Sequence, residues 1–187
     1  MEFNAADIFE GVVQRIPDRE AVVLGDTRLT YKELDARANK AAHALKKLNV
    51  SKGSHIGIYA FNCIEWLEIM LGAYKLCAIP ININYRYVEE ELKYLIDNAD
   101  MEAIFFNQQF SEKLNNIADA LPLLKTYVSI DDGSGKTSDL AAVDYEVLIQ
   151  AESEEQLPQL RSGDDQYILY TGGTTGMPKG VVWRMED

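Results

Sequence analysis

The stretch "HIGIYAFNCIEWLEIMLGAYKLCAIPINI", residues 55–83, predicts the architecture of the chain. Its first seven residues form an apolar run typical of a buried strand, and the closing "IPINI" predicts a second short strand. Between them, residues 63–78 are apolar nearly all round, which indicates a helix buried between layers, with Asn62 as its N-cap. A strand, a helix and another strand in this order predict a parallel βαβ unit.

The same alternation continues on both sides of this unit. Thr30 followed three residues later by Glu33 is a capping box that predicts the start of a helix, and Asn4 can cap an earlier one. The other predicted elements are helices at 4–16, 30–48, 88–99, 110–121 and 144–155, a hairpin at 20–31, and strands at 102–106, 125–130 and 166–170. The predicted fold class is therefore α/β, with a mainly parallel sheet flanked by helices.

Charge and composition exclude several classes of protein. The 187 residues are 47% hydrophobic and 26% charged, which permits a sizeable core in one domain, or in one domain and part of a second. The net charge of −12 argues against a nucleic-acid or anionic-membrane surface, because such surfaces need clustered Lys and Arg. No apolar run reaches the length of about 18 residues that a transmembrane helix requires.

Two further features bear on the cellular compartment. The N-terminal residues lack the basic region and long apolar core of a signal peptide. Cys63 and Cys77 are too few for a disulfide framework and are expected to be small buried thiols. A reducing compartment follows, and the cytoplasm is the default expectation.

The stretch "YILYTGGTTGMPKGVVW", Tyr167 to Trp183, differs in chemistry from the rest of the chain. The twenty residues 166–185 contain no Asp or Glu and carry a charge of +2, so the rest of the chain carries −14. Four glycines allow backbone N–H groups to approach an anion closely, three threonines add hydroxyls, and Lys179 adds a positive charge. A phosphate site is favoured, and a Gly/Thr hairpin loop without function remains the alternative.

Neither of the two common nucleotide-binding motifs fits this stretch. Gly172, Gly173 and Gly176 have neither the Walker A nor the dinucleotide-binding spacing. A second stretch, "IDDGSGKTS" at 130–138, imitates the end of a Walker A loop around Lys136, but Ile130 stands where that motif requires a glycine. Two aspartates would also repel the phosphates, so a polar surface loop is the predicted role of 130–138.

Residues Tyr170 to Gly180 closely resemble the signature loop of the adenylate-forming superfamily, which includes acyl-CoA synthetases, luciferases and adenylation domains of peptide synthetases. The pattern there is roughly Tyr-Thr-Ser/Gly-Gly-Thr-Thr-Gly-x-Pro-Lys-Gly. The segments 29–45 and 62–92 resemble two further blocks of that superfamily. In detail the chain is most similar to fatty-acid-type acyl-CoA synthetases, and Gly172 with Trp183-Arg184 resembles a subgroup acting on long-chain or sterol side-chain acids.

The resemblance implies an activity and a set of cofactors. Members join a small-molecule carboxylic acid to ATP with Mg²⁺, release pyrophosphate, and pass the acyl group from the acyl-adenylate to CoA. The site residues that the resemblance implies are Lys179 for catalysis, Thr171, Gly172, Gly173, Thr174, Thr175, Gly176 and Lys179 for binding the nucleotide, and Thr171 for the metal. Many members carry a histidine shortly after the loop, where this chain has Arg184 and no histidine.

The resemblance also implies that residues 1–187 are the first part of the large N-terminal domain of such an enzyme. The remainder of that domain and the small C-terminal domain, which carry the adenine, acyl and most of the CoA contacts, are absent. The fragment is therefore expected to be inactive alone, and to self-associate through surface that the absent parts would cover. The alternatives are a stand-alone, non-catalytic module that binds a nucleotide or a partner, and a Walker-type NTPase that uses Lys136.

Overall fold

The computed structural model describes residues 3–171 and 177–187. Within these ranges the elements are, in chain order, α1 (Ala5–Arg15), β1 (Glu20–Leu24), β2 (Thr27–Thr30), α2 (Tyr31–Lys47), β3 (His55–Tyr59), α3 (Ile64–Leu76), β4 (Ile79–Asn82), α4 (Glu89–Asn98), β5 (Ala103–Asn107), η1 (Gln108–Phe110), α5 (Ser111–Ile117), η2 (Ala118–Ala120), β6 (Thr126–Ile130), β7 (Val143–Asp144), α6 (Tyr145–Gln150), β8 (Gln166–Thr171) and β9 (Lys179–Arg184). No helix in the described ranges has the length and apolar character needed to cross a membrane.

A parallel sheet organises these elements. Its strands lie in the order β4-β3-β5-β6-β7, and every neighbouring pair is parallel. β3 pairs with β4 on one side, where His55 lies opposite Ile79, and with β5 on the other, where Ile56 lies opposite Ala103. The predicted α/β fold with a mainly parallel sheet is therefore confirmed.

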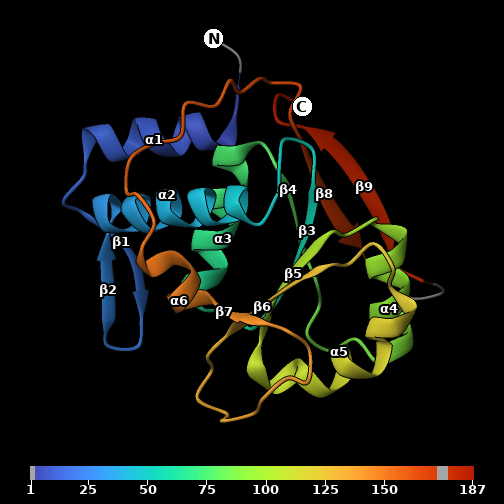
Figure 1. Ribbon diagram of the computed structural model, residues 1–187. Helices are drawn as coiled ribbons and strands as arrows, with labels where there is room; N and C mark the ends of the chain where they lie inside the picture. Colours follow the sequence, from blue (N-terminus) through green and yellow to red (C-terminus); the bar gives the residue numbers. More distant parts are fainter. Residues whose placement is uncertain (1–2, 172–176) are drawn as a thin grey trace.

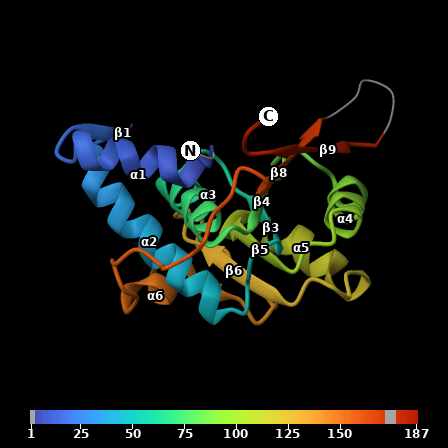
Figure 2. The same ribbon diagram turned by 90° about the horizontal axis from the view of Figure 1, so that it is seen from above.

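Helices cover both faces of this sheet, so that two cores form (Figures 1 and 2). On one face α2, α3 and α6 cover the sheet, and the core contains Ile56 and Ile58 of β3 with Ile69 of α3. On the other face α4 and α5 cover it, and the core contains Ile104 and Phe106 of β5. Each such side chain contributes about 1.5–3 kcal/mol when fully buried.

α3 is buried on several sides, as its nearly uniform apolar character predicted. At Gly72 an added Cβ would lie 2.8 Å from Cβ of Ala41 and 3.0 Å from the carbonyl oxygen of Ala38, so the glycine permits α2 to pack closely against α3. The predicted cap was wrong. The helix starts at Ile64 after Cys63, whose side chain makes no capping hydrogen bond, and Asn62 is one residue too early to cap it.

Two fully buried charges on α3 connect it to other elements. Glu68 receives an ion pair from Arg37 of α2 and a hydrogen bond of 3.0 Å from the hydroxyl of Tyr145 of α6. Lys75 lies 2.5 Å from a carboxylate oxygen of Glu10 in α1 and 2.8 Å from one of Asp35 in α2. The sequence pattern did not predict these pairs, because an apolar helix gives no sign of which charges it buries.

Two later helices are shorter than predicted. Asp144 caps α6 by accepting a hydrogen bond of 3.0 Å from the N–H of Val147, but the helix ends at Gln150 and not at Glu155. The following segment instead meets α2, where the side-chain amide of Asn39 donates to the carbonyl oxygen of Glu154 at 2.8 Å. The helix predicted at 110–121 is α5 flanked by the short turns η1 and η2.

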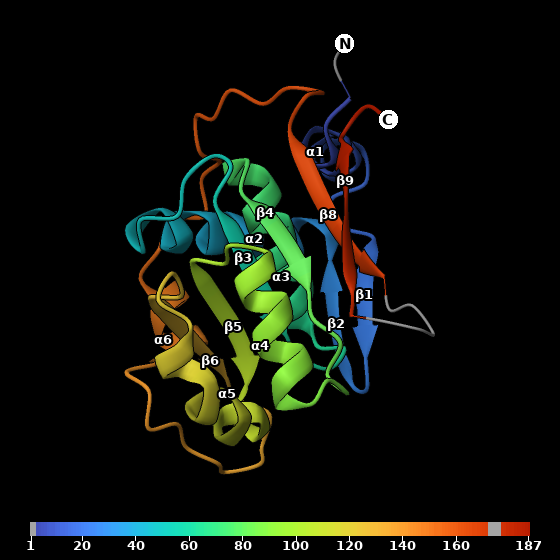
Figure 3. The ribbon, with the colours of Figure 1, turned by 90° about the vertical axis from the view of Figure 1, so that its right-hand side faces the viewer.

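The last two strands form a separate antiparallel hairpin. β8 pairs with β9 from Gln166 opposite Arg184 to Thr171 opposite Lys179. The hairpin lies beside β4 at the edge of the parallel sheet, with β8 between β4 and β9 (Figure 3). The strand predicted at 166–170 is confirmed, and it leads directly into the glycine-rich stretch.

Removing Arg37 tests the burial of Glu68. The variant Arg37→Met leaves a buried carboxylate without its cation, which we expect to lower the free energy of unfolding by about 3 kcal/mol. Urea unfolding followed by circular dichroism measures this change. The double variant Arg37→Met/Glu68→Gln should recover part of it, and a double variant no more stable than the single one would contradict this role of the pair.

The outer edge of β9 leads us to propose self-association of the 187-residue chain. β9 pairs with β8 alone among the described strands, and Val181, Val182 and Trp183 are 39%, 56% and 42% exposed. Such an edge is a template for pairing with a second copy. Light scattering over a concentration series should show association that Val182→Lys weakens and that Val147→Lys, at an exposed position of α6, does not. A monomer throughout would contradict the proposal.

Candidate phosphate site

The β8–β9 hairpin brings two of the predicted site residues together. Thr171 at the carboxyl end of β8 lies directly opposite Lys179 at the start of β9, and both are exposed. Pro178, next to Lys179, is buried. The other predicted residues, Gly172, Gly173, Thr174, Thr175 and Gly176, lie outside the described ranges. The hairpin thus presents one hydroxyl and one ammonium group side by side at the two ends of the glycine-rich stretch.

The charges of the hairpin are not equivalent. Arg184 forms ion pairs with Asp164 at 3.0 Å, Glu186 at 3.0 Å and Asp187 at 2.8 Å. Within the described ranges, Lys179 forms no ion pair with a carboxylate. Of the two positive charges in this region, that of Arg184 is therefore neutralised by carboxylates, whereas that of Lys179 remains available to an anion.

Asp165, immediately before β8, fixes the base of the hairpin. Its side chain is buried and accepts hydrogen bonds from the side-chain amide of Asn4 at 3.1 Å and from the N–H of Ser162 at 2.9 Å. Its other oxygen lies 2.5 Å from the ammonium of Lys52. Burial raises the pKa of Asp165, but the bonds from Lys52 and Ser162 outweigh burial, so the pKa lies below its usual value.

Arg161 makes a second attachment just before the hairpin. Its guanidinium group donates to both carboxylate oxygens of Glu10 in α1, at 2.7 and 2.8 Å, and pairs with Asp7 of the same helix. The same Glu10 holds buried Lys75 of α3. The segment that enters β8 is therefore attached to α1 before the hairpin begins, and Glu10 joins α1 to α3.

The stretch 130–138, which imitates a Walker A loop, is a surface loop closed by its own hydrogen bonds. Asp131 accepts a hydrogen bond of 2.9 Å from the N–H of Gly133, and Asp132 accepts one of 3.0 Å from the N–H of Ser134. These are N–H groups of the kind that a phosphate would need. No helix follows the loop; the chain continues to β7. The predicted polar surface loop is confirmed, with its backbone donors used by its own aspartates.

A group of aromatic side chains lies at the carboxyl ends of the parallel strands, which the sequence interpretation missed. Phe61, after β3, has its ring centroid 4.7 Å from that of Tyr85, after β4, and 5.2 Å from that of Phe110. Asn107 at the end of β5 is buried and accepts the N–H of Phe61 at 2.8 Å. The strand order reverses here between β3 and β5, a position where open sheets form ligand sites. Part of the signal was present in the sequence, since Phe61 ends one predicted strand, Tyr85 lies two residues after a second and Asn107 directly follows a third.

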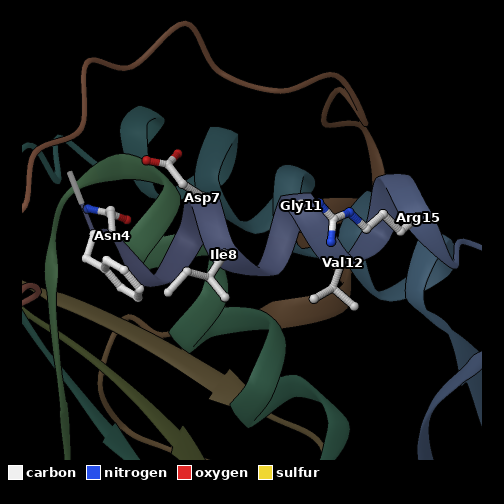
Figure 4. Close-up of a pocket in the computed structure, with 7 residues that line it drawn as sticks. Asn4, Asp7, Ile8, Gly11, Val12 and Arg15 are labelled. Carbon is white, nitrogen blue, oxygen red and sulfur yellow. The ribbon is translucent and has the colours of Figure 1, made fainter. Parts of the chain in front are cut away.

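A hollow of about 570 Å³ runs along the outer side of α1 (Figure 4). Ile8 and Val12 project from the same side of the helix into this region, and Gly11 and Arg15 also line it. Of the residues predicted to bind ATP, the two that the structure describes, Thr171 and Lys179, do not line this hollow. Its walls are mainly apolar and include the carboxylate of Asp7, which does not suit a polyphosphate.

The described residues contain no cluster of three His, Cys, Asp or Glu side chains that could hold a metal ion. Mg²⁺ prefers a few oxygen ligands from the protein together with phosphate and water oxygens. The exposed hydroxyl of Thr171 fits such a role, and its assignment as a Mg²⁺ ligand stays a prediction.

The fold and the hairpin are those of an adenylate-forming enzyme. The chain belongs to the AMP-binding enzyme family, whose model matches residues 9–187. It is 44% identical to a 3-oxocholest-4-en-26-oate--CoA ligase of Rhodococcus rhodochrous over its whole length. It is 46% identical to a medium/long-chain-fatty-acid--CoA/3-oxocholest-4-en-26-oate--CoA ligase of Mycobacterium marinum over 98% of its length. It covers 34% of each relative, so it spans about a third of their length.

Solved structures agree with this assignment. An anthranilate CoA ligase in complex with anthranoyl-AMP superposes on 99% of the chain with a TM-score of 0.91 and 25% identity, and 35% of that ligase is covered. The N-terminal domain of FACL13 from Mycobacterium tuberculosis superposes on 100% of the chain with a TM-score of 0.84 and 25% identity, with 45% of that domain covered. The resemblance to the N-terminal part of an acyl-CoA synthetase is confirmed.

The depressed pKa of Asp165 predicts how the stability of the chain depends on pH. The contribution of Asp165 is present above its unfolded pKa of about 3.9 and is lost as pH falls through the lower folded value. Asp165→Asn should therefore lower the melting temperature at neutral pH, and the difference from the parent chain should shrink below pH of about 4. Asp164→Asn, at the exposed neighbouring position, is the control. A pH-independent difference would contradict the role of the Asp165 carboxylate.

Proposed function

We propose that residues 1–187 are the N-terminal part of an ATP-dependent acid–thiol ligase, in which they supply the phosphate-binding loop. The observation that carries the proposal is the motif from Tyr170 to Gly180 on an anchored hairpin, with Thr171 opposite Lys179, which forms no ion pair within residues 3–171 and 177–187. The names of the similar proteins supply the reaction class, since they are CoA ligases.

The proposed reaction has two steps. A carboxylate oxygen of the acid forms a bond to the α-phosphorus of ATP, and the bond from that phosphorus to pyrophosphate breaks. The CoA thiolate then attacks the acyl carbon, and AMP leaves. Bound Mg²⁺ would offset phosphate charge, with Thr171 as one oxygen ligand.

Within this scheme the chain binds and orients the leaving group. Lys179 meets the β- and γ-phosphates and offsets the charge that develops on pyrophosphate, and the glycines and threonines at 172–176 contribute N–H and hydroxyl donors. Because the chain spans a third of its relatives, we propose that these residues bind but do not complete the reaction. We further propose that the ligase works in a reducing compartment such as the cytoplasm, which the free thiols of Cys63 and Cys77 support.

The acid is proposed from the relatives alone. Both carry 3-oxocholest-4-en-26-oate in their names, and the Mycobacterium marinum ligase also carries medium- and long-chain fatty acids. A sterol side-chain acid or a medium- to long-chain fatty acid is therefore the substrate class to test first, in the full-length protein that contains this segment.

Charge removal at Lys179 tests the proposed function. In the full-length protein, Lys179→Met should lower the rate of pyrophosphate release by about 10- to 100-fold, because a hydrogen bond to a charged group contributes about 1.5–3 kcal/mol. The measurement is a coupled pyrophosphate assay with ATP, CoA and a panel of fatty and sterol acids.

The matched control is Lys136→Met in the closed loop, which should leave the rate unchanged. Loss of activity at Lys136 with activity retained at Lys179 would favour a Walker-type site instead. Nucleotide binding without pyrophosphate release for any acid would favour a non-catalytic module.

A further inference from the structure

Tyr170 and Gly180 are in close contact across the hairpin. They are register partners, and an added Cβ at position 180 would lie 3.0 Å from two ring carbons of Tyr170 and 3.2 Å from its hydroxyl oxygen. Gly180 has no positive φ, so no backbone conformation requires a glycine there. The ring of Tyr170 occupies the space that any larger residue at position 180 would need.

The hydroxyl of the same side chain leaves the hairpin and meets α4. It donates a hydrogen bond of 2.8 Å to Oδ1 of Asn98, the last residue of that helix. The ring also packs against the core on the α4 side of the sheet. One side chain therefore joins β8, β9 and α4 at the end of the hairpin that carries the glycine-rich stretch.

We infer that Tyr170 is a positioning residue that fixes both ends of the phosphate-binding loop to the body of the protein. Thr171 and Lys179 are the next pair outward from Tyr170 and Gly180, so the contact sets where each end of the loop begins. Holding the ends lowers the entropy that nucleotide binding must remove. We call Tyr170, Gly180 and Asn98 the Tyr170 clamp. Its effect on nucleotide binding rests on the proposed function.

Because of where the clamp lies, its loss should change the ends of the loop locally without changing the stability of the whole chain. Asn98 and Gly180 are exposed, so water can replace the hydrogen bond when it is lost and overall stability changes little. Asp165 and Arg161 hold the other end of β8 independently of Tyr170. Loss of the clamp should therefore free the loop ends without unfolding the hairpin.

The test uses hydroxyl and acceptor variants in the full-length ligase. Tyr170→Phe and Asn98→Leu should each raise the KM for ATP about fivefold, the effect of one ordinary hydrogen bond, with no further rise in the double variant. The KM for the acid and the melting temperature should stay unchanged. Asn98→Asp keeps the acceptor atom and should restore the KM for ATP. Tyr167→Phe removes a hydroxyl from the same strand and is the control.

Gly180→Ala tests the ring contact. It should raise the KM for ATP in the parent background and have a smaller effect in a Tyr170→Ala background, where no ring must move. Equal effects in the two backgrounds would overturn the ring contact. An unchanged KM for ATP in Tyr170→Phe, in an active ligase, would overturn the assignment.

Amide hydrogen exchange of the 187-residue chain separates this inference from the proposed function. Tyr170→Phe should speed exchange at Thr171 and Lys179 but not at Gln166, near Asp165. Faster exchange in this chain, together with no pyrophosphate release by the full-length protein for any acid, would support the clamp and overturn the proposed function. Unchanged exchange would overturn the clamp, whatever the activity.

Discussion

The two charges buried on α3 constrain the arrangement of the surrounding elements. Glu68 and Lys75 are fully buried, and a buried charge is tolerated only with a partner of opposite sign and good geometry. Arg37 therefore holds α2 to α3, with Tyr145 adding α6, while Glu10 holds α1 through Lys75. The apolar residues of α3 place it against the sheet, but its charges determine which neighbours surround it.

The same ion pairs extend to the candidate site. Glu10 binds Arg161 as well as Lys75, and Asp165 binds Asn4 at the start of α1. The base of the β8–β9 hairpin is thus attached to α1, and the far end is attached to α4 through the Tyr170 clamp. Among the described strands the hairpin does not pair with the parallel sheet, so these side chains and the buried Ile168 hold it beside β4. The glycine-rich stretch on such a support therefore begins at Thr171 and ends at Lys179 beside a body that is held in place at both ends of the hairpin.

Local sequence patterns predicted the elements of the fold well. Thr30 with Glu33 and Asn4 formed the caps expected of them, and alternating strands and helices produced the parallel sheet. The prediction that Asn62 caps α3 was wrong because a cap must directly precede the helix, and α3 starts one residue later than predicted. The helix predicted to reach Glu155 ends at Gln150, and the segment after it makes a long-range contact with Asn39 that no local pattern contains.

The candidate site could be predicted only in part. The motif itself named Thr171 and Lys179, and the structure places them opposite each other. The pairs that support the motif, such as Asp165 with Lys52 and Tyr170 with Asn98, join residues 113 and 72 positions apart, and a single sequence gives no signal for them. The neutralisation of Arg184 by three nearby carboxylates was also missed, because the net charge of residues 166–185 takes no account of the acidic residues just before and just after them.

The most direct test is a titration of the ¹⁵N-labelled 187-residue chain with magnesium pyrophosphate, followed by amide chemical shifts. Binding at the hairpin predicts saturable shifts at Thr171, Met177 and Lys179 that are lost in Lys179→Met. Shifts centred on Gly133 to Lys136, or shifts that survive Lys179→Met unchanged, would contradict a phosphate site on the β8–β9 hairpin.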